Sequence, residues 1–377
     1  MIIGIDIRIL GNSRRSGIVE YAEQLVGRMI EQAPEHTFKL FFSSFRQKLP
    51  AYRWLSAKNV TLYSYRVPNN ILFLANRFFS WPLIDRMLGG VDVFFSPHFF
   101  IASLSNDCRR FTTFHDLSYL RFPEFFTLGK RLWHTIEMNP IRQARLSDRI
   151  IAVSESTKSD LVELYHIDPA NISVVYSGVS MKRPTLEHLE HFRQKHDLPK
   201  RFIFSLSTLE PRKNTKAIIR AFVRLKEVPG FDDCWLVLGG DRGWLSDDII
   251  GEMESSPAVS HIRYLGYISD EDRPYYYATA EVFAYPSFFE GFGLPVLEAM
   301  ACGTPVVTSH NSSLPEVAGD AAVLVDPYNV ADITSALELL LTDQRFRTRC
   351  IDKGLVRAKE FSWDRSVRET LRVLTDF

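Results

Sequence analysis

The chain alternates short apolar runs with longer stretches in which apolar residues recur every three or four positions. Residues 2–10 form the first apolar run and predict a β-strand, whereas residues 18–30 have the period of an amphipathic helix. Strand and helix patterns continue to alternate along most of the chain. This order is typical of parallel sheets covered by helices, so the sequence predicts an α/β protein.

The remaining predicted elements fall into two groups separated by a charged stretch. The first group has predicted strands at residues 37–42, 91–95, 110–114, 149–153 and 174–179, with a helix at 158–165. The second has predicted strands at residues 202–207, 234–238, 262–265, 282–285 and 306–308, with helices at 213–226, 335–341 and 345–377. Between them, residues 180–200 are charged, rich in histidine and contain two prolines, which predicts a linker.

These groups predict two domains, because 377 residues exceed the usual size of one domain. We expect an N-terminal Rossmann-like domain over residues 1–178 and a C-terminal Rossmann-like domain over residues 179–359. A final helix at residues 360–377 is expected to pack back on the first domain, with Phe361 and Trp363 as buried anchors.

Composition and charge narrow the class of protein. The formal net charge is +0, which gives no support to nucleic-acid binding. Residues 1–178 carry about five more basic than acidic side chains, which fits an anionic acceptor, a membrane surface or ordinary drift in composition. The four cysteines form no C-x-x-C pair and the histidines have no H-x-x-x-H spacing, so we expect neither a disulfide framework nor a zinc site.

The N-terminus reads as a first strand rather than a signal peptide, because it reaches an acid at Asp6. No run of eighteen apolar residues occurs. These features predict a cytoplasmic protein, with a peripheral position on the inner face of the plasma membrane left open. Residues 71–86 combine aromatic and cationic side chains, which fits either an interfacial segment or a helix buried against the sheet.

The strongest chemical signal lies between residues 284 and 307. A predicted strand ends at Pro286, a loop with Gly291 and Gly293 follows, and Pro295 is expected at the first helical position. Loops that leave the carboxyl ends of strands bind ligands in open α/β sheets. Free N–H groups at the start of a helix also suit a diphosphate.

Seven residues separate Glu290 from Glu298. Glu290, in the loop, could accept hydrogen bonds from sugar hydroxyls. Glu298, expected in the first turn of the helix, could accept them from a ribose. The alternatives are that Glu298 only complements the helix dipole and that Glu290 is a surface charge.

The run from Phe289 to Ala299 resembles the E-x7-E signature of retaining glycosyltransferases of family 4. The resemblance covers nearly the whole chain and is strongest over residues 202–327. It implies the glycosyltransferase-B fold, in which two Rossmann-like domains face each other across a cleft, with net retention of configuration and no cofactor or catalytic metal. It also implies that the donor sugar contacts Glu290 and the backbone of Gly291, Phe292, Gly293 and Leu294.

Other positions match this family residue by residue. Residues 207–214, which begin at Ser207, resemble its phosphate clamp, which implies that Arg212 and Lys213 neutralise the leaving diphosphate. A solvated basic turn is the alternative. His115 resembles the histidine that contacts the donor sugar when the domains close, and a purely structural histidine is the alternative.

Three further segments have weaker signals. Gly17 resembles the first-domain glycine loop that closes over the diphosphate, and Tyr267 and Ile268 are expected to present backbone groups to the base. Residues 270–272 have the D-x-D spacing of a metal motif from a different fold. Because Arg273 and a tyrosine-rich helical pattern follow, we interpret them as acids at a helix start.

The runs at residues 96–98, 114–117 and 207–214 look most like bacterial mannosyltransferases of O-antigen and exopolysaccharide synthesis. This resemblance implies GDP-mannose as donor and a glycan or polyprenyl-diphosphate-linked oligosaccharide as acceptor. Another GDP- or dTDP-deoxyhexose or a UDP-hexose stays open as donor. Rival functions are a nucleotide-sugar 2-epimerase, a glycan phosphorylase, which would need lysine-bound pyridoxal phosphate and a longer chain, and an inactive sugar-nucleotide-binding partner.

Overall fold

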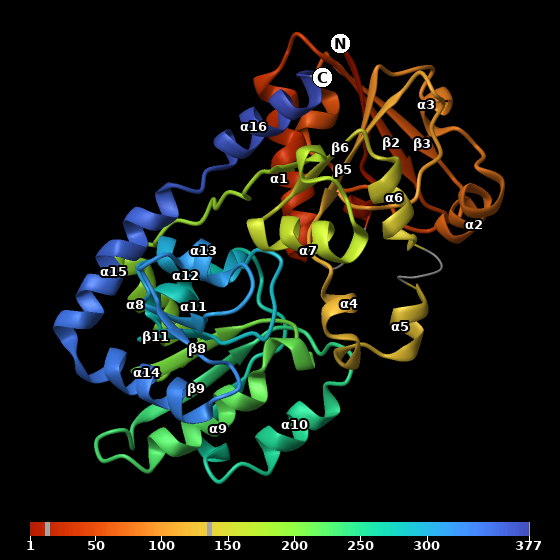
Figure 1. The fold of residues 1–377 in the computed structure, drawn as a ribbon. Coiled ribbons are helices and arrows are strands. Elements are labelled where there is room, and N and C mark those ends of the chain that lie inside the picture. The colour runs from red at the N-terminus through yellow and green to blue at the C-terminus, as the bar shows by residue number, and fades with distance from the viewer. Residues whose placement is uncertain (12–15, 134–137, 377) are drawn as a thin grey trace. The chain divides into compact units, whose positions relative to one another are not determined.

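A computed structural model describes residues 1–11, 16–133 and 138–376. The chain divides into two compact units. The first unit contains Met1–Pro123, Leu128–Gly178 and Trp363–Phe377, and the second contains Glu124–Thr127 and Val179–Ser362. Each unit carries its own parallel sheet with helices around it (Figure 1), which confirms the prediction of two Rossmann-like folds.

The sheet of the first unit has seven strands in the order β3-β2-β1-β4-β5-β6-β7. In chain order they are β1 (Ile2–Asp6), β2 (Thr37–Ser43), β3 (Val60–Tyr65), β4 (Val93–Ser96), β5 (Arg109–Phe114), β6 (Arg149–Ala152) and β7 (Ile172–Val174). All pairings are parallel, and the order changes direction between β1 and β4. Ligands bind at such a switch point in doubly wound sheets.

The helices of this unit surround that sheet (Figure 1). They are α1 (Gly17–Gln32), α2 (Asn69–Phe79), α3 (Ile84–Met87), α4 (Ser118–Arg121), α5 (Leu128–Leu132), α6 (Pro140–Leu146), α7 (Glu155–Tyr165) and α16 (Trp363–Thr375), with short 3-10 turns at Arg8–Gly11, Arg53–Ser56 and Pro169–Asn171. Ser16 caps α1 by accepting a hydrogen bond from the Val19 N–H. The apolar face of α1, which includes Leu25 and Met29, is buried.

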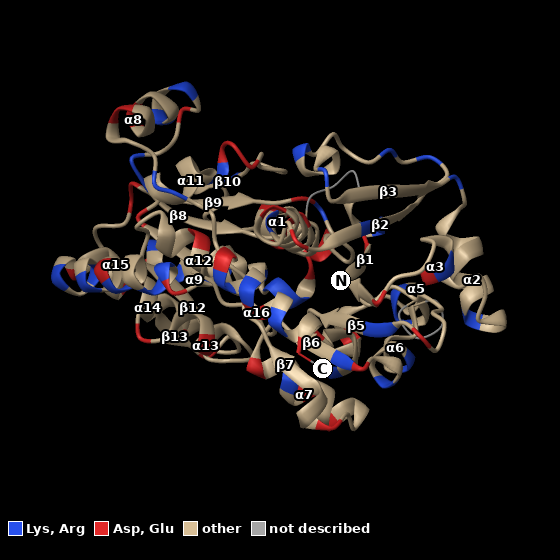
Figure 2. Ribbon diagram, turned by 90° about the horizontal axis from the view of Figure 1, so that it is seen from above, with Lys and Arg blue, Asp and Glu red and all other residues tan. Residues whose placement is uncertain are grey.

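Helix α16 returns the end of the chain to the first unit. It lies beside α1 (Figure 2), where the Trp363 ring is 6.0 Å from that of Tyr21. Arg28 of α1 forms an ion pair with Asp364 at 3.2 Å. Trp363 is buried in the first unit, as predicted, whereas Phe361 is buried in the second unit, before α16 begins, and does not anchor the helix.

The second unit has a six-stranded parallel sheet in the order β10-β9-β8-β11-β12-β13. Its strands are β8 (Arg201–Leu206), β9 (Cys234–Gly239), β10 (Ile262–Tyr264), β11 (Val282–Tyr285), β12 (Val306–Ser309) and β13 (Val323–Val325). Its helices are α8 (Leu186–Lys195), α9 (Thr215–Lys226), α10 (Asp247–Glu254), α11 (Arg273–Thr279), α12 (Leu294–Ala301), α13 (Leu314–Ala318), α14 (Val330–Thr342) and α15 (Gln344–Lys359), with short 3-10 turns at Pro211–Lys213 and Val259–His261.

Several predicted elements were wrong in detail. The first strand ends at Asp6, and a 3-10 turn follows it. The strand expected at residues 174–179 is β7, which ends at Val174. The predicted linker contains α8, whose Leu189 and Phe192 are buried.

The predicted C-terminal helix is two helices, α15 and α16, interrupted after Lys359; its last residue, Phe377, lies outside the described residues. Strands β3 and β13 were not predicted. Both lie at sheet edges, where fewer side chains are buried and the apolar pattern is weaker.

The segment at residues 71–86 includes α2, which is buried on one side only, and an interfacial role for it stays a prediction. On α2, Leu72 and Phe73 are buried, whereas Ile71, Leu74 and Phe78 are exposed. Among the described residues, no helix has the length and apolarity needed to cross a bilayer.

Candidate functional site

The predicted clamp residues meet the loop after β11. The Lys213 ammonium donates to both Glu290 carboxylate oxygens, at 2.7 and 2.9 Å, and to the Tyr285 hydroxyl at 3.0 Å. Arg212 donates through Nη1 to Glu290 Oε2 at 3.0 Å and through Nη2 to Glu210 Oε1 at 2.8 Å. The structure therefore brings Arg212, Lys213 and Glu290 together at the carboxyl ends of β8 and β11.

This cluster is electrically balanced, since two carboxylates face two cations. The side chain of Glu290 is only 7% exposed and those of Arg212 and Lys213 are 12% exposed, which contradicts both a surface charge and a solvated basic turn. Burial alone raises the pKa of Glu290, but Lys213 and Arg212 outweigh burial and hold that pKa at about 2. Burial and the neighbouring Arg212 charge lower the pKa of Lys213.

Hydrogen bonds from other segments hold the loop around Glu290. Its N–H donates to the Ser312 hydroxyl at 2.9 Å, and its carbonyl accepts from the Ser313 hydroxyl at 2.9 Å. The Ser313 hydroxyl also donates to the Phe292 carbonyl, and the Asn214 amide donates to the Pro286 carbonyl. The loop is thus positioned by contacts of the folded chain itself.

Position 293 needs a glycine because of its backbone conformation, and the missing side chain would also let a ligand approach closely. Its φ of +109° is a conformation that side chains rarely adopt, and an added Cβ would lie 2.8 Å from Leu314 Cδ2. It precedes α12, in which Pro295 is the second residue rather than the first. Leu294 begins that helix, and Gly291 and Phe292 are buried in the loop before it.

Glu298 lies in a separate ion network. It belongs to the second turn of α12, not the first, so it does not complement the helix dipole as the alternative required. Its Oε1 accepts from Arg273 Nη1 at 3.1 Å, and its Oε2 accepts from the Tyr277 hydroxyl at 2.7 Å. Glu298 is therefore attached to α11, whereas Glu290 is attached to the clamp.

Tyr267 and Ile268, which are expected near the base, follow β10, and Ser207 of the clamp motif follows β8 in the same sheet. An added Cβ on Gly240 would lie 1.8 Å from the Ser207 carbonyl oxygen, and the Gly240 N–H donates to the Gly266 carbonyl at 2.7 Å. Ile268 is buried against Gly239, and Tyr267 is 53% exposed. Residues 270–272 do precede α11, as interpreted, and Asp270 forms an ion pair with Arg273.

His115 directly follows β5 in the first unit. Its Nε2 lies 2.8 Å from the Pro97 carbonyl, so this nitrogen carries the proton. Burial lowers the pKa of His115 to about 4, although the Pro97 hydrogen bond raises it. The ring meets that of Tyr21, on α1, edge to face at 4.8 Å.

Gly17 is the exposed first residue of α1, so it begins a helix and is not within a loop. Residues 12–15, which the predicted glycine loop includes, lie outside the described residues.

Sequence reasoning missed four partners of the predicted residues, namely Glu210, Arg273, Tyr277 and Tyr285. Glu210 stands in the clamp motif itself, two residues before Arg212, so its pairing had a signal. Arg273, 25 positions from Glu298, had none.

Comparisons with known proteins agree with this architecture. The Glycosyltransferase Family 4 model matches residues 15–183, and the Glycosyl transferases group 1 model matches residues 187–357. The O-antigen chain mannosyltransferase B of Escherichia coli is 33% identical over 372 residues, 94% of this chain and 95% of that protein. The serotype-specific mannosyltransferase WbdA of Escherichia coli is 31% identical over 66% of this chain, which spans 31% of that longer protein.

Among solved structures, HepE of Anabaena in complex with UDP and glucose has a TM-score of 0.76 at 16% identity. The match covers 100% of this chain and 99% of that one, and it bears on the fold alone. Together with the two family models and the full-length relative, these similarities show that the chain belongs to the family 4 glycosyltransferases and has the glycosyltransferase-B fold.

Proposed function

We propose that this chain transfers a hexose, mannose from GDP-mannose, to a hydroxyl of a glycan acceptor with retention of configuration. The observation that carries this proposal is the buried cluster of Arg212, Lys213 and Glu290 at the carboxyl edge of the second sheet. The names of two relatives, both mannosyltransferases of Escherichia coli, support mannose as the sugar. Surface polysaccharide synthesis at the inner face of the plasma membrane is the setting that fits such a reaction.

The charge balance of the cluster indicates how a donor would bind. Arg212 and Lys213 are neutralised by Glu210 and Glu290, so an entering diphosphate competes with these carboxylates for the cations. A diphosphate carries more negative charge than one carboxylate, and we expect it to draw Lys213 away from Glu290. Glu290 then has oxygens available to accept hydrogen bonds from the sugar hydroxyls.

In the reaction the bond between the anomeric carbon and the diphosphate oxygen breaks, and its electron pair stays on the diphosphate. The acceptor oxygen bonds to the anomeric carbon on the same face, and its proton passes to a departing phosphate oxygen. Arg212 and Lys213 stabilise the charge that develops on the leaving group. Each carboxylate oxygen of Glu298 accepts a hydrogen bond from Arg273 or Tyr277, and because such an oxygen can accept a second bond, a ribose hydroxyl can bind without displacing either partner.

Replacing Lys213 tests the clamp. We expect Lys213→Ala to lower turnover by at least about tenfold, because the leaving diphosphate loses one cation. Steady-state release of nucleotide from GDP-mannose, with acceptor, measures the effect. Lys216→Ala is the matched control, since Lys216 lies three residues later, on α9, and pairs with Glu252 rather than with the clamp.

Loss of folding must be separated from loss of chemistry, because Lys213→Ala leaves a buried carboxylate with fewer partners. The double variant Lys213→Met/Glu290→Gln removes both charges and should recover thermal stability without recovering turnover. Full turnover in Lys213→Ala would contradict the clamp.

A panel of nucleotide sugars, with and without acceptor, separates the rival functions. A transferase releases nucleotide faster with acceptor, an epimerase releases it without one, and an inactive binding partner releases none. Proton NMR of the glycoside product reports whether the anomeric configuration is retained. Release from a UDP- or dTDP-sugar alone would contradict GDP-mannose as donor.

A further inference from the structure

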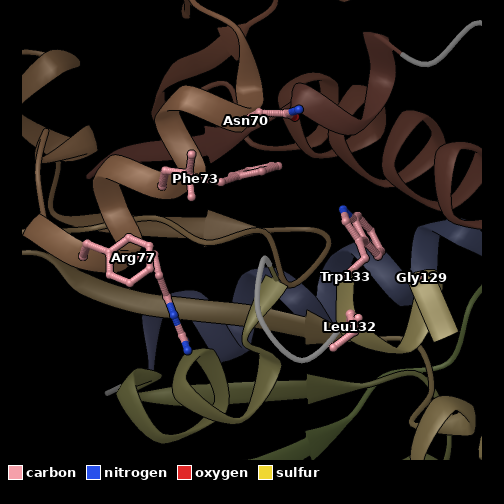
Figure 3. Close-up of a pocket in the computed structure, with 8 residues that line it drawn as sticks. Asn70, Phe73, Arg77, Gly129, Leu132 and Trp133 are labelled. Atoms are coloured by element: carbon pink, nitrogen blue, oxygen red, sulfur yellow. The ribbon is translucent and has the colours of Figure 1, made fainter.

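A groove of about 470 Å³ lies between α2 and α5 of the first unit. Among the described residues, eight line it: Asn70, Phe73, Leu74, Arg77, Phe78, Gly129, Leu132 and Trp133. Figure 3 shows Asn70 and Phe73 on the α2 side and Leu132 and Trp133 facing them from the α5 side. A groove of this size can hold a small ligand.

Phe73, which lines the groove, packs against residues that follow strands at the carboxyl edge of the first sheet. The Phe73 ring lies 5.8 Å from that of Phe100, and the Arg8 guanidinium stands 5.2 Å from both ring centres. Arg8 follows β1 and is buried in a bidentate pair with Asp6, and Phe100 follows β4. The switch point between these two strands is where doubly wound sheets bind ligands.

Ring contacts connect this floor with His115. Phe100 lies 4.9 Å from His98, and His98 lies 5.7 Å from His115. All of these residues belong to the first unit. The groove and His115 therefore lie at the same edge of one sheet.

The mouth of the groove is apolar and exposed to water. Of the described side chains that line it, Leu74, Phe78, Leu132 and Trp133 are large, apolar and exposed. A concentration of exposed apolar side chains marks a binding surface.

The charges of the two helices are all positive. Arg77, Lys130 and Arg131 are their only charged residues, and neither helix contains an acid. Within the part of the chain that the structure describes, the Arg77 guanidinium has no hydrogen bond or ion pair. The apolar groove, with the Arg77 cation beside it, complements a molecule that has an apolar chain and an anionic head.

We propose that this groove binds the lipid end of an amphiphilic acceptor, an apolar chain that carries a phosphate. The chain lies between Phe73, Phe78 and Trp133, and the phosphate meets Arg77. This inference rests on the proposed function, because it makes the groove the acceptor's site. It extends that function by assigning the acceptor's chain to this groove and its phosphate to Arg77, at the same edge of the sheet as His115.

Dodecyl phosphate, used below its micelle concentration, is a suitable probe. Calorimetric titration of the full-length protein, with excess inorganic diphosphate to occupy any diphosphate site of the second unit, measures its affinity. We expect Phe78→Ser to weaken binding roughly tenfold, because apolar area is lost from the bound chain. We expect Arg77→Gln to weaken it about fivefold, because the phosphate loses its cation.

Phe79→Ser is the matched control. Phe79 is the next residue of α2 and is 78% exposed, against 67% for Phe78, but it does not line the groove. Its replacement should leave dodecyl phosphate binding unchanged, and thermal unfolding checks that each variant is folded.

Three results would overturn the inference. The first is a wild-type protein that does not bind the probe, and the second is binding that excess inorganic diphosphate abolishes. The third is an equal loss of affinity in Phe78→Ser and Phe79→Ser, with equal loss of flotation on phosphatidylglycerol vesicles, which would make the surface a bilayer-docking face. Lys213→Ala should not affect probe binding, so failure of the groove and failure of the donor clamp are distinguishable.

Discussion

The protonation of His115 makes the stability of the first unit depend on pH. Burial lowers the pKa of His115 to about 4, so the folded ring stays neutral at pH values where an unfolded histidine is protonated. As the pH falls from about 6.5 to about 4, the unfolded chain therefore binds a proton that the folded chain does not. We expect the free energy of unfolding to fall over this window by at most about 3 kcal/mol from this residue.

Urea unfolding of wild type and His115→Asn at several pH values between 7 and 4 measures this effect. The variant removes the titration, while the asparagine amide can still donate to the Pro97 carbonyl. His166→Asn is the control, because His166 is exposed and its φ of 55° is tolerated by asparagine. Identical pH dependence in wild type and His115→Asn would show that His115 titrates normally.

At the scale of residues, the sequence predicted that Arg212, Lys213 and Glu290 would lie together, but it did not predict which of them would form ion pairs. Arg212, Lys213 and Glu290 each follow a strand of one parallel sheet, and the family motif placed them at one edge. Their mutual neutralisation was not predicted, because Glu290 and Lys213 lie 77 positions apart and only the fold sets their distance. The same reason hid Arg273 as the partner of Glu298.

At the scale of elements, four residues of one loop belong to a different unit from their neighbours. The chain leaves the first unit at Pro123, contributes Glu124–Thr127 to the second unit and returns at Leu128. In the second unit Phe126 stacks on Trp244 at 5.5 Å, and the Trp244 Nε1–H donates to the Phe125 carbonyl. This excursion, Glu124–Thr127, therefore packs within the second unit.

We expect Phe126→Ala to destabilise the second unit by about 3 kcal/mol, because a buried ring is lost from Trp244. Scanning calorimetry, combined with tryptophan fluorescence, detects the lowered transition. Leu128→Ala, which replaces an exposed residue just after the excursion, should leave the transition unchanged. Equal midpoints for Phe126→Ala and wild type would mean that this packing adds no stability.

Elements with strong apolar periodicity were predictable, and weakly buried ones were not. The predicted helix at residues 18–30 corresponds to α1 and the predicted strand at 282–285 to β11. Helix α8 buries only Leu189 and Phe192, so its charged surface looked like a linker. The excursion at Glu124–Thr127 had no local signal, because its partners Trp244 and Phe288 come more than a hundred positions later.

At the scale of the whole molecule, the first unit is completed by the end of the chain. Val367 of α16 is fully buried, and Ser366 donates to the Tyr176 carbonyl, so α16 is part of the first unit's packing. We expect Val367→Ser to reduce hydrogen-exchange protection in α1 while α9, in the second unit, keeps its protection. The neighbouring Arg368 is exposed, and Arg368→Ser should leave both helices protected. Loss of protection in α9 together with α1 would show instead that the two units unfold as one cooperative body. Val367→Ser would then lower hydrogen-exchange protection around the donor clamp as much as around His115.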